Sequence, residues 1–237
     1  MQKNKTSEWI NLTTNELDAL DRKRPVIFPI GSIEAHGQHL PLITDSGIAE
    51  TIARKACERT EGILLPPLYY AYLGAPKRFV GGINIPAELC GELLKAIVRC
   101  VFESGFTKMI LYNGHASNKY SIEIALRALL DELEQRGLKI QALSWWDDLP
   151  VRVRHACEVE TAMAVAALGE NVLREDKIKD NIMKYPGWRV NDWHKLAPDS
   201  GSVNGNPSKF REQDGAGLIK TATEKLVSLI NDAHKNW

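Results

Sequence analysis

Two carboxylates and two imidazoles lie within one short stretch of the sequence, residues 31–45. Glu34 and His36 are two residues apart, and in an extended chain such side chains point to the same side. Asp45 begins a segment with helical spacing of apolar residues, where its carboxylate could bridge the other two groups. Carboxylates and imidazoles gathered in this way suit one or two metal ions that activate water for hydrolysis.

Two residues of this stretch also have a structural interpretation. Asp45 could cap the helix that follows it, because aspartate is a preferred N-cap residue. His39 is interpreted as a packed core or loop histidine. Since capping and metal binding do not exclude each other, Glu34, His36 and Asp45 together are predicted to bind metal.

A second polar group follows the predicted strand at residues 108–112. Asn113, Gly114 and His115 come directly after this strand, as the first group follows the predicted strand at 25–30. Open parallel sheets bind ligands at the carboxyl ends of their strands. His115 is therefore predicted to be a remote ligand of the same site, with Gly114 allowing close approach of the backbone.

A third group opens a predicted helix over residues 158–168. Glu158 and Glu160 are not both expected at the site, because residues two apart on a helix point away from each other. His155 is a candidate for proton transfer to a leaving group, since imidazole accepts and donates protons near neutral pH. An orienting role is the alternative for His155. Cys157 is the one cysteine near this chemistry.

The elements that position these groups alternate between strands and helices. Predicted strands cover 25–30, 62–68, 108–112 and 139–146. Predicted helices cover 45–56, 86–105, 118–136, 158–168 and 218–233. This alternation requires crossover connections and a parallel sheet, so we predict an α/β fold in one domain, residues 1–237. Residues 74–86 are expected to form a long loop, and 184–213 a loop or lid.

Composition excludes several classes of protein. Hydrophobic residues make up 44% and charged residues 25%, as in ordinary globular proteins. Thirty basic and thirty acidic residues leave no positive field for nucleic acid. No signal peptide and no apolar run of about 20 residues is present, so a cytoplasmic protein without membrane contact is expected. The four cysteines lack a C-x-x-C pair, and Cys90 and Cys100 are expected to be buried thiols.

Residues 31–45 read GSIEAHGQHLPLITD, and this stretch resembles the signature of the creatininase family, G-S-x-E-x-H-G-x-H-L-P-L-x-T-D, at every fixed position. Further matches extend the resemblance over nearly the whole chain: Asn113-Gly114-His115, Asn118, His155-Ala156, Glu160-Thr161 and Gly205-Asn206-Pro207. The resemblance implies a three-layer α/β/α sandwich with a mostly parallel central sheet. It also implies a homo-oligomer, with a hexamer as one form.

The resemblance further implies two divalent ions per chain, of zinc, manganese or iron. The ligands it implies are Glu34 and His115 on one ion, His36 on the other, and Asp45 bridging. Creatinine-cleaving members have a glutamate two residues after the histidine matched by His115, whereas this chain has Ser117. The second ion would then take Glu160, which the resemblance favours over Glu158, or water. A single-metal site is the alternative.

Other departures lie where family members hold substrate, and they argue against creatinine. Residues 74–82 read GAPKRFVGG in place of a Glu-His pair followed by an aromatic residue and Pro-Gly-Thr. His155 is followed by Ala-Cys where members have Ala-Gly. Lys77 or Arg78 could bind a carboxylate or an oxygen-rich group. Other candidate substrate contacts are Ser117 and the pocket-forming tryptophans Trp145, Trp146, Trp188 and Trp193.

The sequence thus predicts a metal-dependent hydrolase of a small molecule. The leading hypothesis is an amidohydrolase that cleaves a C–N bond of a small cyclic amide or formamide-like substrate through a metal-activated water. The rival is hydrolysis of a polyol- or sugar-derived cyclic ketone or lactone. A hypothesis of another class is an inactive, metal-stabilised scaffold or binding protein, but structural zinc sites are typically closed and rich in Cys and His.

Overall fold

The computed structural model describes residues 7–147, 149–184 and 192–237. Within them the chain forms a five-stranded sheet in the order β1-β3-β2-β4-β5, and every pairing is parallel. Its strands are β1 (Ser7–Glu8), β2 (Val26–Ile30), β3 (Ile63–Leu64), β4 (Lys108–Asn113) and β5 (Lys139–Ser144). The predicted α/β class and parallel sheet are confirmed.

Helices connect and cover these strands, close to the predicted positions. They are α1 (Thr14–Asp18), α2 (Thr44–Cys57), α3 (Ala87–Glu103), α4 (Asn118–Leu133), α5 (Glu158–Leu168), α6 (Trp193–Leu196) and α7 (Gly215–Asn236). Short 3-10 turns are η1 (Trp9–Asn11), η2 (Glu134–Arg136), η3 (Glu170–Val172), η4 (Glu175–Lys177), η5 (Pro198–Ser200) and η6 (Pro207–Glu212). The described part of the segment 184–213, which was predicted to be a loop or lid, contains α6 and two such turns; residues 185–191 lie outside the described residues. No described helix is both long and apolar enough to cross a membrane.

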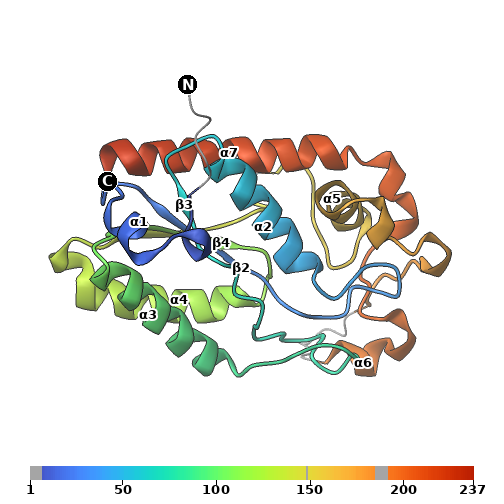
Figure 1. The fold of residues 1–237 in the computed structure, drawn as a ribbon. Helices are drawn as coiled ribbons and strands as arrows, with labels where there is room; N and C mark the ends of the chain where they lie inside the picture. Colours follow the sequence, from blue (N-terminus) through green and yellow to red (C-terminus); the bar gives the residue numbers. More distant parts are fainter. Residues whose placement is uncertain (1–6, 148, 185–191) are drawn as a thin grey trace.

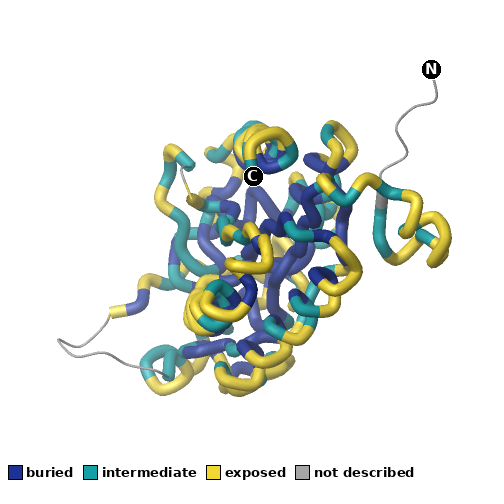
Figure 2. The backbone as a smooth tube through the Cα atoms, turned by 90° about the vertical axis from the view of Figure 1, so that its left-hand side faces the viewer, coloured by how far each residue is buried: buried dark blue, intermediate teal, exposed yellow. Residues whose placement is uncertain are grey.

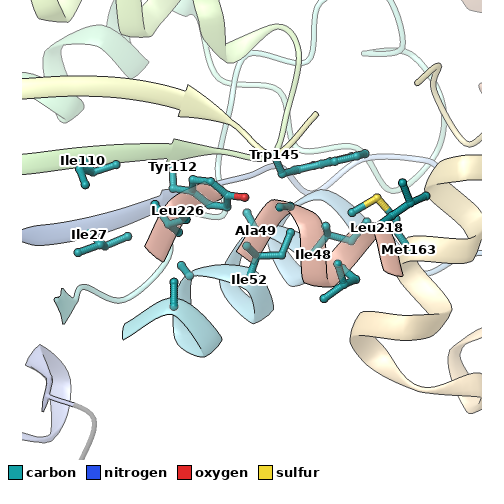
Figure 3. Packing of buried hydrophobic residues seen from close by; sticks show 14 of the residues in the cluster. Ile27, Ile48, Ala49, Ile52, Ile110, Tyr112, Trp145, Met163, Leu218 and Leu226 are labelled. Carbon is teal, nitrogen blue, oxygen red and sulfur yellow. The ribbon is translucent and has the colours of Figure 1, made fainter. Parts of the chain in front are cut away.

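The sheet lies between two helical layers (Figure 1), which confirms the expected α/β/α sandwich. Helices α2, α5 and α7 pack together on one face, and α3 and α4 pack together on the other. Side chains of β2 alternate between the two: Ile27 belongs to the first core, whereas Val26 and Phe28 belong to the second. Figure 3 shows Ile27 in the same buried hydrophobic cluster as Ile48 and Ile52 of α2. In Figure 2 the buried strands run between helices that are exposed on their outer sides.

Two details of the prediction are corrected. The strand predicted at 62–68 is only two residues long, because Pro66 and Pro67 cannot donate to a neighbouring strand; beyond them a bridge pairs Ile30 with Leu68. Cys90 is a buried free thiol as predicted, but Cys100 is exposed.

The order of the strands determines where a site can form. From the central strand β2 the chain first adds β3 on one side and then β4 on the other. The loops after β2 and β4 therefore diverge at the carboxyl edge of the sheet, which is where open α/β sheets bind ligands. Gly114, after β4, lies so close to α2 that an added Cβ would overlap the carbonyl oxygen of Asp45.

Replacing Gly114 with alanine tests this close approach. Because the backbone of α2 cannot move away from the new methyl group without repacking, Gly114→Ala should lower the free energy of unfolding by about 1–3 kcal/mol. The measurement is urea denaturation followed by circular dichroism. The matched control is Gly91→Ala in α3, whose Cβ would lie 3.6 Å from the Ser121 carbonyl oxygen; it should stabilise by up to about 1 kcal/mol. Equal midpoints for both variants would contradict the close contact.

Candidate metal centre

The polar side chains singled out by the sequence meet in the interior. Glu34 and His36 lie in the loop after β2, Asp45 in the first turn of α2, His115 in the loop after β4, and Glu160 in the first turn of α5. Each of the five is at most 5% exposed. Charged groups are seldom buried this fully without a partner of opposite charge. The structure thus brings together three carboxylates and two imidazoles from four separate segments.

Asp45 lies at the centre of the group. Its Oδ1 is 3.0 Å from Nε2 of His36, and its Oδ2 is 2.8 Å from Nδ1 of His115. The hydroxyl of Ser32 donates a hydrogen bond of 2.8 Å to Oδ2 and holds the carboxylate in place. Ile43, not Asp45, is the N-cap residue of α2, so the capping interpretation of Asp45 is wrong. Each carboxylate oxygen instead faces a different imidazole.

His36 and His115 are oriented by backbone carbonyls. Nδ1 of His36 lies 3.1 Å from the carbonyl oxygen of Glu34, and Nε2 of His115 lies 3.1 Å from that of Tyr72. Because a carbonyl oxygen only accepts, each of these nitrogens carries the hydrogen. The other ring nitrogen then faces Asp45. Fixing one N–H in this way is how proteins orient imidazoles that bind metal.

Glu34 supplies the observation that most favours a cation. Its side chain is fully buried, and neither carboxylate oxygen has a hydrogen-bond partner among the described residues. Nδ1 of His115 comes within 3.0 Å of Oε1, but its hydrogen bond is to Asp45. Burying an ionised carboxylate costs several kcal/mol unless positive charge lies beside it, either as a proton on His115 or as a cation. The donor set present therefore fits a metal ion.

Three groups of side chains place one ligand atom each within 4.8 Å of one another. They are Glu34–Asp45–His115, His36–Asp45–Glu160, and Glu34–His36–His155. The first two share Asp45, whose two oxygens face opposite sides. This arrangement can hold two neighbouring cations with Asp45 between them.

Proton binding shows how strongly the site favours positive charge. Burial alone would lower the pKa of His36, but Asp45 and Glu160 raise it to about 10. Burial likewise opposes protonation of His115, yet Glu34 and Asp45 raise its pKa well above the ordinary value. Burial raises the pKa of Glu160 to about 7, against the effect of His36. Protons on the imidazoles offset the buried carboxylates where cations are absent.

His155 lies beside this group with its tautomer fixed. Its Nε2 is 2.9 Å from the Ala35 carbonyl oxygen and 3.1 Å from the Ser202 hydroxyl, so Nε2 carries the hydrogen. Nδ1 is left with a lone pair, 3.6 Å from a carboxylate oxygen of Glu34. Burial, together with His36, lowers the pKa of His155. The ring is therefore neutral near pH 7 and can accept a proton through Nδ1.

The surroundings of His39 and Cys157 indicate a packing role for both side chains. His39 is buried, its Nε2 is 3.0 Å from the Thr161 hydroxyl, and burial lowers its pKa to about 4. This agrees with a packed core histidine. Cys157 is also buried, its sulfur accepts the backbone N–H of Arg154, and burial raises its pKa to about 11. A thiol with this pKa is not a nucleophile at neutral pH.

A cavity of about 350 Å³ opens onto the group, at the small end of the range for ligand sites. Glu34, Asp45, His115, His155 and Glu160 line it. Ser117, Trp146 and Trp193, all predicted substrate contacts or pocket walls, line it as well. Trp145 does not, since it is buried in the core, and Trp188 lies outside the described residues. The cavity is thus lined by both aromatic side chains and the carboxylates of the site.

The structure does not bring Arg78 to this cavity. Its side chain is 60% exposed and its Nε lies 3.1 Å from a carboxylate oxygen of Asp192. Lys77 is also exposed. The next residue along from Asp192, Trp193, donates its backbone N–H to the carbonyl of Ala75 at 3.0 Å. The loop that contains Lys77 and Arg78 therefore holds the start of α6 beside the cavity, through the Arg78–Asp192 ion pair and the Trp193–Ala75 hydrogen bond.

Sequence reasoning missed Arg154, which does line the cavity. The available signal was its position next to His155. It also missed the carbonyls of Ala35 and Tyr72, because any residue can supply a carbonyl and only the folded loops show which one does.

Comparisons with known proteins agree with this geometry. The family described as "Creatininase: Creatinine amidohydrolase" matches residues 10–230. A mycofactocin precursor peptide peptidase from Mycobacterium ulcerans is 30% identical over 218 residues, 86% of this chain and 84% of the relative. A 2-amino-5-formylamino-6-ribosylaminopyrimidin-4(3H)-one 5'-monophosphate deformylase from Methanococcus maripaludis is 27% identical over 217 residues, 89% of this chain and 87% of the relative.

The fold is similar to that of solved structures as well. A solved structure described as "Creatininase Mn" superposes with a TM-score of 0.86 at 21% identity, covering 98% of this chain and 100% of that one. The family match extends over both polar loops and all five buried side chains of the site. On this evidence, the chain belongs to the creatininase family of metal-dependent hydrolases.

Proposed function

We propose that the protein hydrolyses the C–N bond of a small amide or formamide-like substrate, with two divalent cations per chain. Glu34, Asp45 and His115 would hold one cation, and His36, Asp45 and Glu160 the other. The observation that carries this proposal is the fully buried Glu34 carboxylate, which has no hydrogen-bond partner among the described residues. It lies near His36 and His115, whose ring nitrogens both face Asp45.

Zinc, manganese and iron all suit this mixture of carboxylate and imidazole ligands. Cations in this position supply the two functions that amide hydrolysis needs, a nucleophilic water near neutral pH and polarisation of the substrate carbonyl. Creatinine-cleaving members have a glutamate at the position of Ser117, and here Glu160 would take its role. A carboxylate oxygen of Glu160 lies 3.6 Å from Nε2 of His36. This favours two cations over one.

The chain's own residues would perform the proton transfer. His155 holds its Nε2 hydrogen against Ala35 and Ser202, so Nδ1 is the atom that would take a proton and pass it to the leaving nitrogen. Trp146 and Trp193 would restrict water around the substrate. A leaving amine needs such a proton to depart.

Two of the relatives support C–N cleavage, because a peptidase and a deformylase both break the bond between a carbonyl carbon and nitrogen. We further propose that residues 1–237 form one hydrolase domain and that the protein is a homo-oligomer. A cytoplasmic location and the lack of a nucleic-acid partner stay predictions.

Metal content provides the most direct test. Purified protein reconstituted with Zn²⁺ or Mn²⁺ should contain two ions per chain by inductively coupled plasma mass spectrometry. Glu34→Gln and Glu160→Gln should each retain about one ion, and Asp45→Asn fewer than one, since Asp45 belongs to both groups. The control is Glu158→Gln, whose carboxylate accepts the Asn206 backbone N–H; it should retain both ions. Two ions in Asp45→Asn would refute the shared ligand.

Removal of metal should make stability depend on pH. The folded-state pKa of His36 is raised to about 10 and that of Glu160 to about 7, so the metal-free folded chain binds more protons than the unfolded chain. The stabilisation from Glu160 is then lost as pH rises from 4.5 to about 7, and that from His36 from 6.5 to about 10. The melting temperature of chelator-treated protein should fall between pH 6.5 and 10, and more steeply than that of metal-loaded protein. If melting temperature depended on pH in the same way with and without metal, protons would not be replacing the cations at this site.

Turnover tests the reaction class. Metal-loaded enzyme should hydrolyse members of a panel of N-formyl amino acids, N-acyl amino acids and cyclic amides, and should be slower on sugar-derived lactones and cyclic ketones. His155→Asn should lower kcat by about 100- to 10,000-fold with both ions retained. His234→Asn, on the distant helix α7, is the control. If His155→Asn loses an ion, His155 is a ligand; if kcat is unchanged, its proposed role in proton transfer is wrong.

A further inference from the structure

Arg154 differs from the other arginines near the site because it is partly buried and has no partner. The structure shows no hydrogen bond, ion pair or cation–π contact of its guanidinium with any described residue, and Arg154 lines the cavity. Arg78, by contrast, is paired with Asp192. A partly buried guanidinium without an anion is free to bind an anionic group of a ligand in the cavity.

The backbone that carries Arg154 is firmly held. Its N–H donates to the sulfur of Cys157, and the N–H of Ala156 donates to a carboxylate oxygen of Glu160. Ala156 has a φ of 49°, in the left-handed region that a non-glycine residue adopts only at a cost. His155, between them, is fixed through Ala35. Arg154 therefore starts from a defined position relative to the catalytic groups.

Charge and shape limit what could meet this guanidinium. The three carboxylates of the cavity belong to the two groups that would hold cations, and two divalent ions would more than neutralise them. A loaded cavity would then be positive on the side of the cations and positive again at Arg154. Its volume of about 350 Å³ admits a small molecule, and Trp146 and Trp193 form part of its wall.

We propose that Arg154 is the specificity-determining residue that binds a carboxylate of the substrate, which makes the preferred substrates small amides with a free carboxylate close to the scissile bond. This inference rests on the proposed C–N hydrolysis and narrows it. N-formyl and N-acyl amino acids have this form. The guanidinium suits the role, because its planar donors match the two oxygens of a carboxylate.

Matched acid and amide ligands provide the test. N-acetyl-L-alanine and N-acetyl-L-alaninamide differ only in the charged group, so calorimetric affinity and kcat/KM on metal-loaded enzyme isolate its contribution. Wild-type protein should prefer the acid by about 10- to 100-fold, as expected for a charge-assisted pair. Arg154→Gln should reduce that preference to about threefold or less, through a higher Kd and KM for the acid, while the affinity for the amide and the metal content stay the same.

Arg152→Gln is the matched control, since Arg152 is exposed and does not line the cavity; the acid preference should persist in it. Persistence of the preference in Arg154→Gln would show that the cations bind the carboxylate, and it would overturn the proposal. Wild-type protein that binds neither ligand, or binds both equally, would overturn it too. Binding of the acid without turnover of any amide in the panel would leave Arg154 supported and would refute the proposed hydrolysis instead.

Discussion

Three carboxylates buried at one edge of the sheet impose the constraint on which the rest of this site depends. Glu34, Asp45 and Glu160 are buried, and Asp45 shares one group of possible metal ligands with Glu34 and another with Glu160. Negative charges so placed repel one another strongly at the low effective dielectric of a protein interior. The fold therefore has to supply positive charge there, either as protons on His36 and His115 or as cations.

The parallel sheet makes this concentration of charge possible. Its strand order separates the loops after β2 and β4, and the space between them receives side chains from α2 and α5 as well. Rigidity then comes from the backbone: the Glu34 and Ala35 carbonyls, which orient His36 and His155, belong to the loop that supplies ligands after β2, and the Tyr72 carbonyl orients His115. Substitution of those loop residues would leave the carbonyls in place, provided that the loop kept its conformation.

The sequence was sufficient for what depends on local spacing. The interval between Glu34 and His36, and the position of His115 directly after a strand, predicted ligands that the structure does bring together. Glu160 was distinguished from Glu158 only through family resemblance, because helical spacing excludes one of them without saying which. Arg78 was predicted and Arg154 was missed, because only the folded chain shows that Asp192 pairs with Arg78 and that Arg154 lines the cavity.

Ser117 links the ligand set to the shape of the cavity. An added Cβ on Gly74 would lie 2.6 Å from the Ser117 hydroxyl, and that hydroxyl donates to the Leu73 carbonyl at 3.4 Å. A small side chain at 117 thus lets residues 73–76 approach and form part of the cavity wall. With serine at 117, the carboxylate that joins His36 and Asp45 in the second group of ligands is Glu160 of α5. Because one departure from the family pattern bears on both the ligands and the wall, a relative's substrate cannot be transferred to this chain on the strength of a shared metal site.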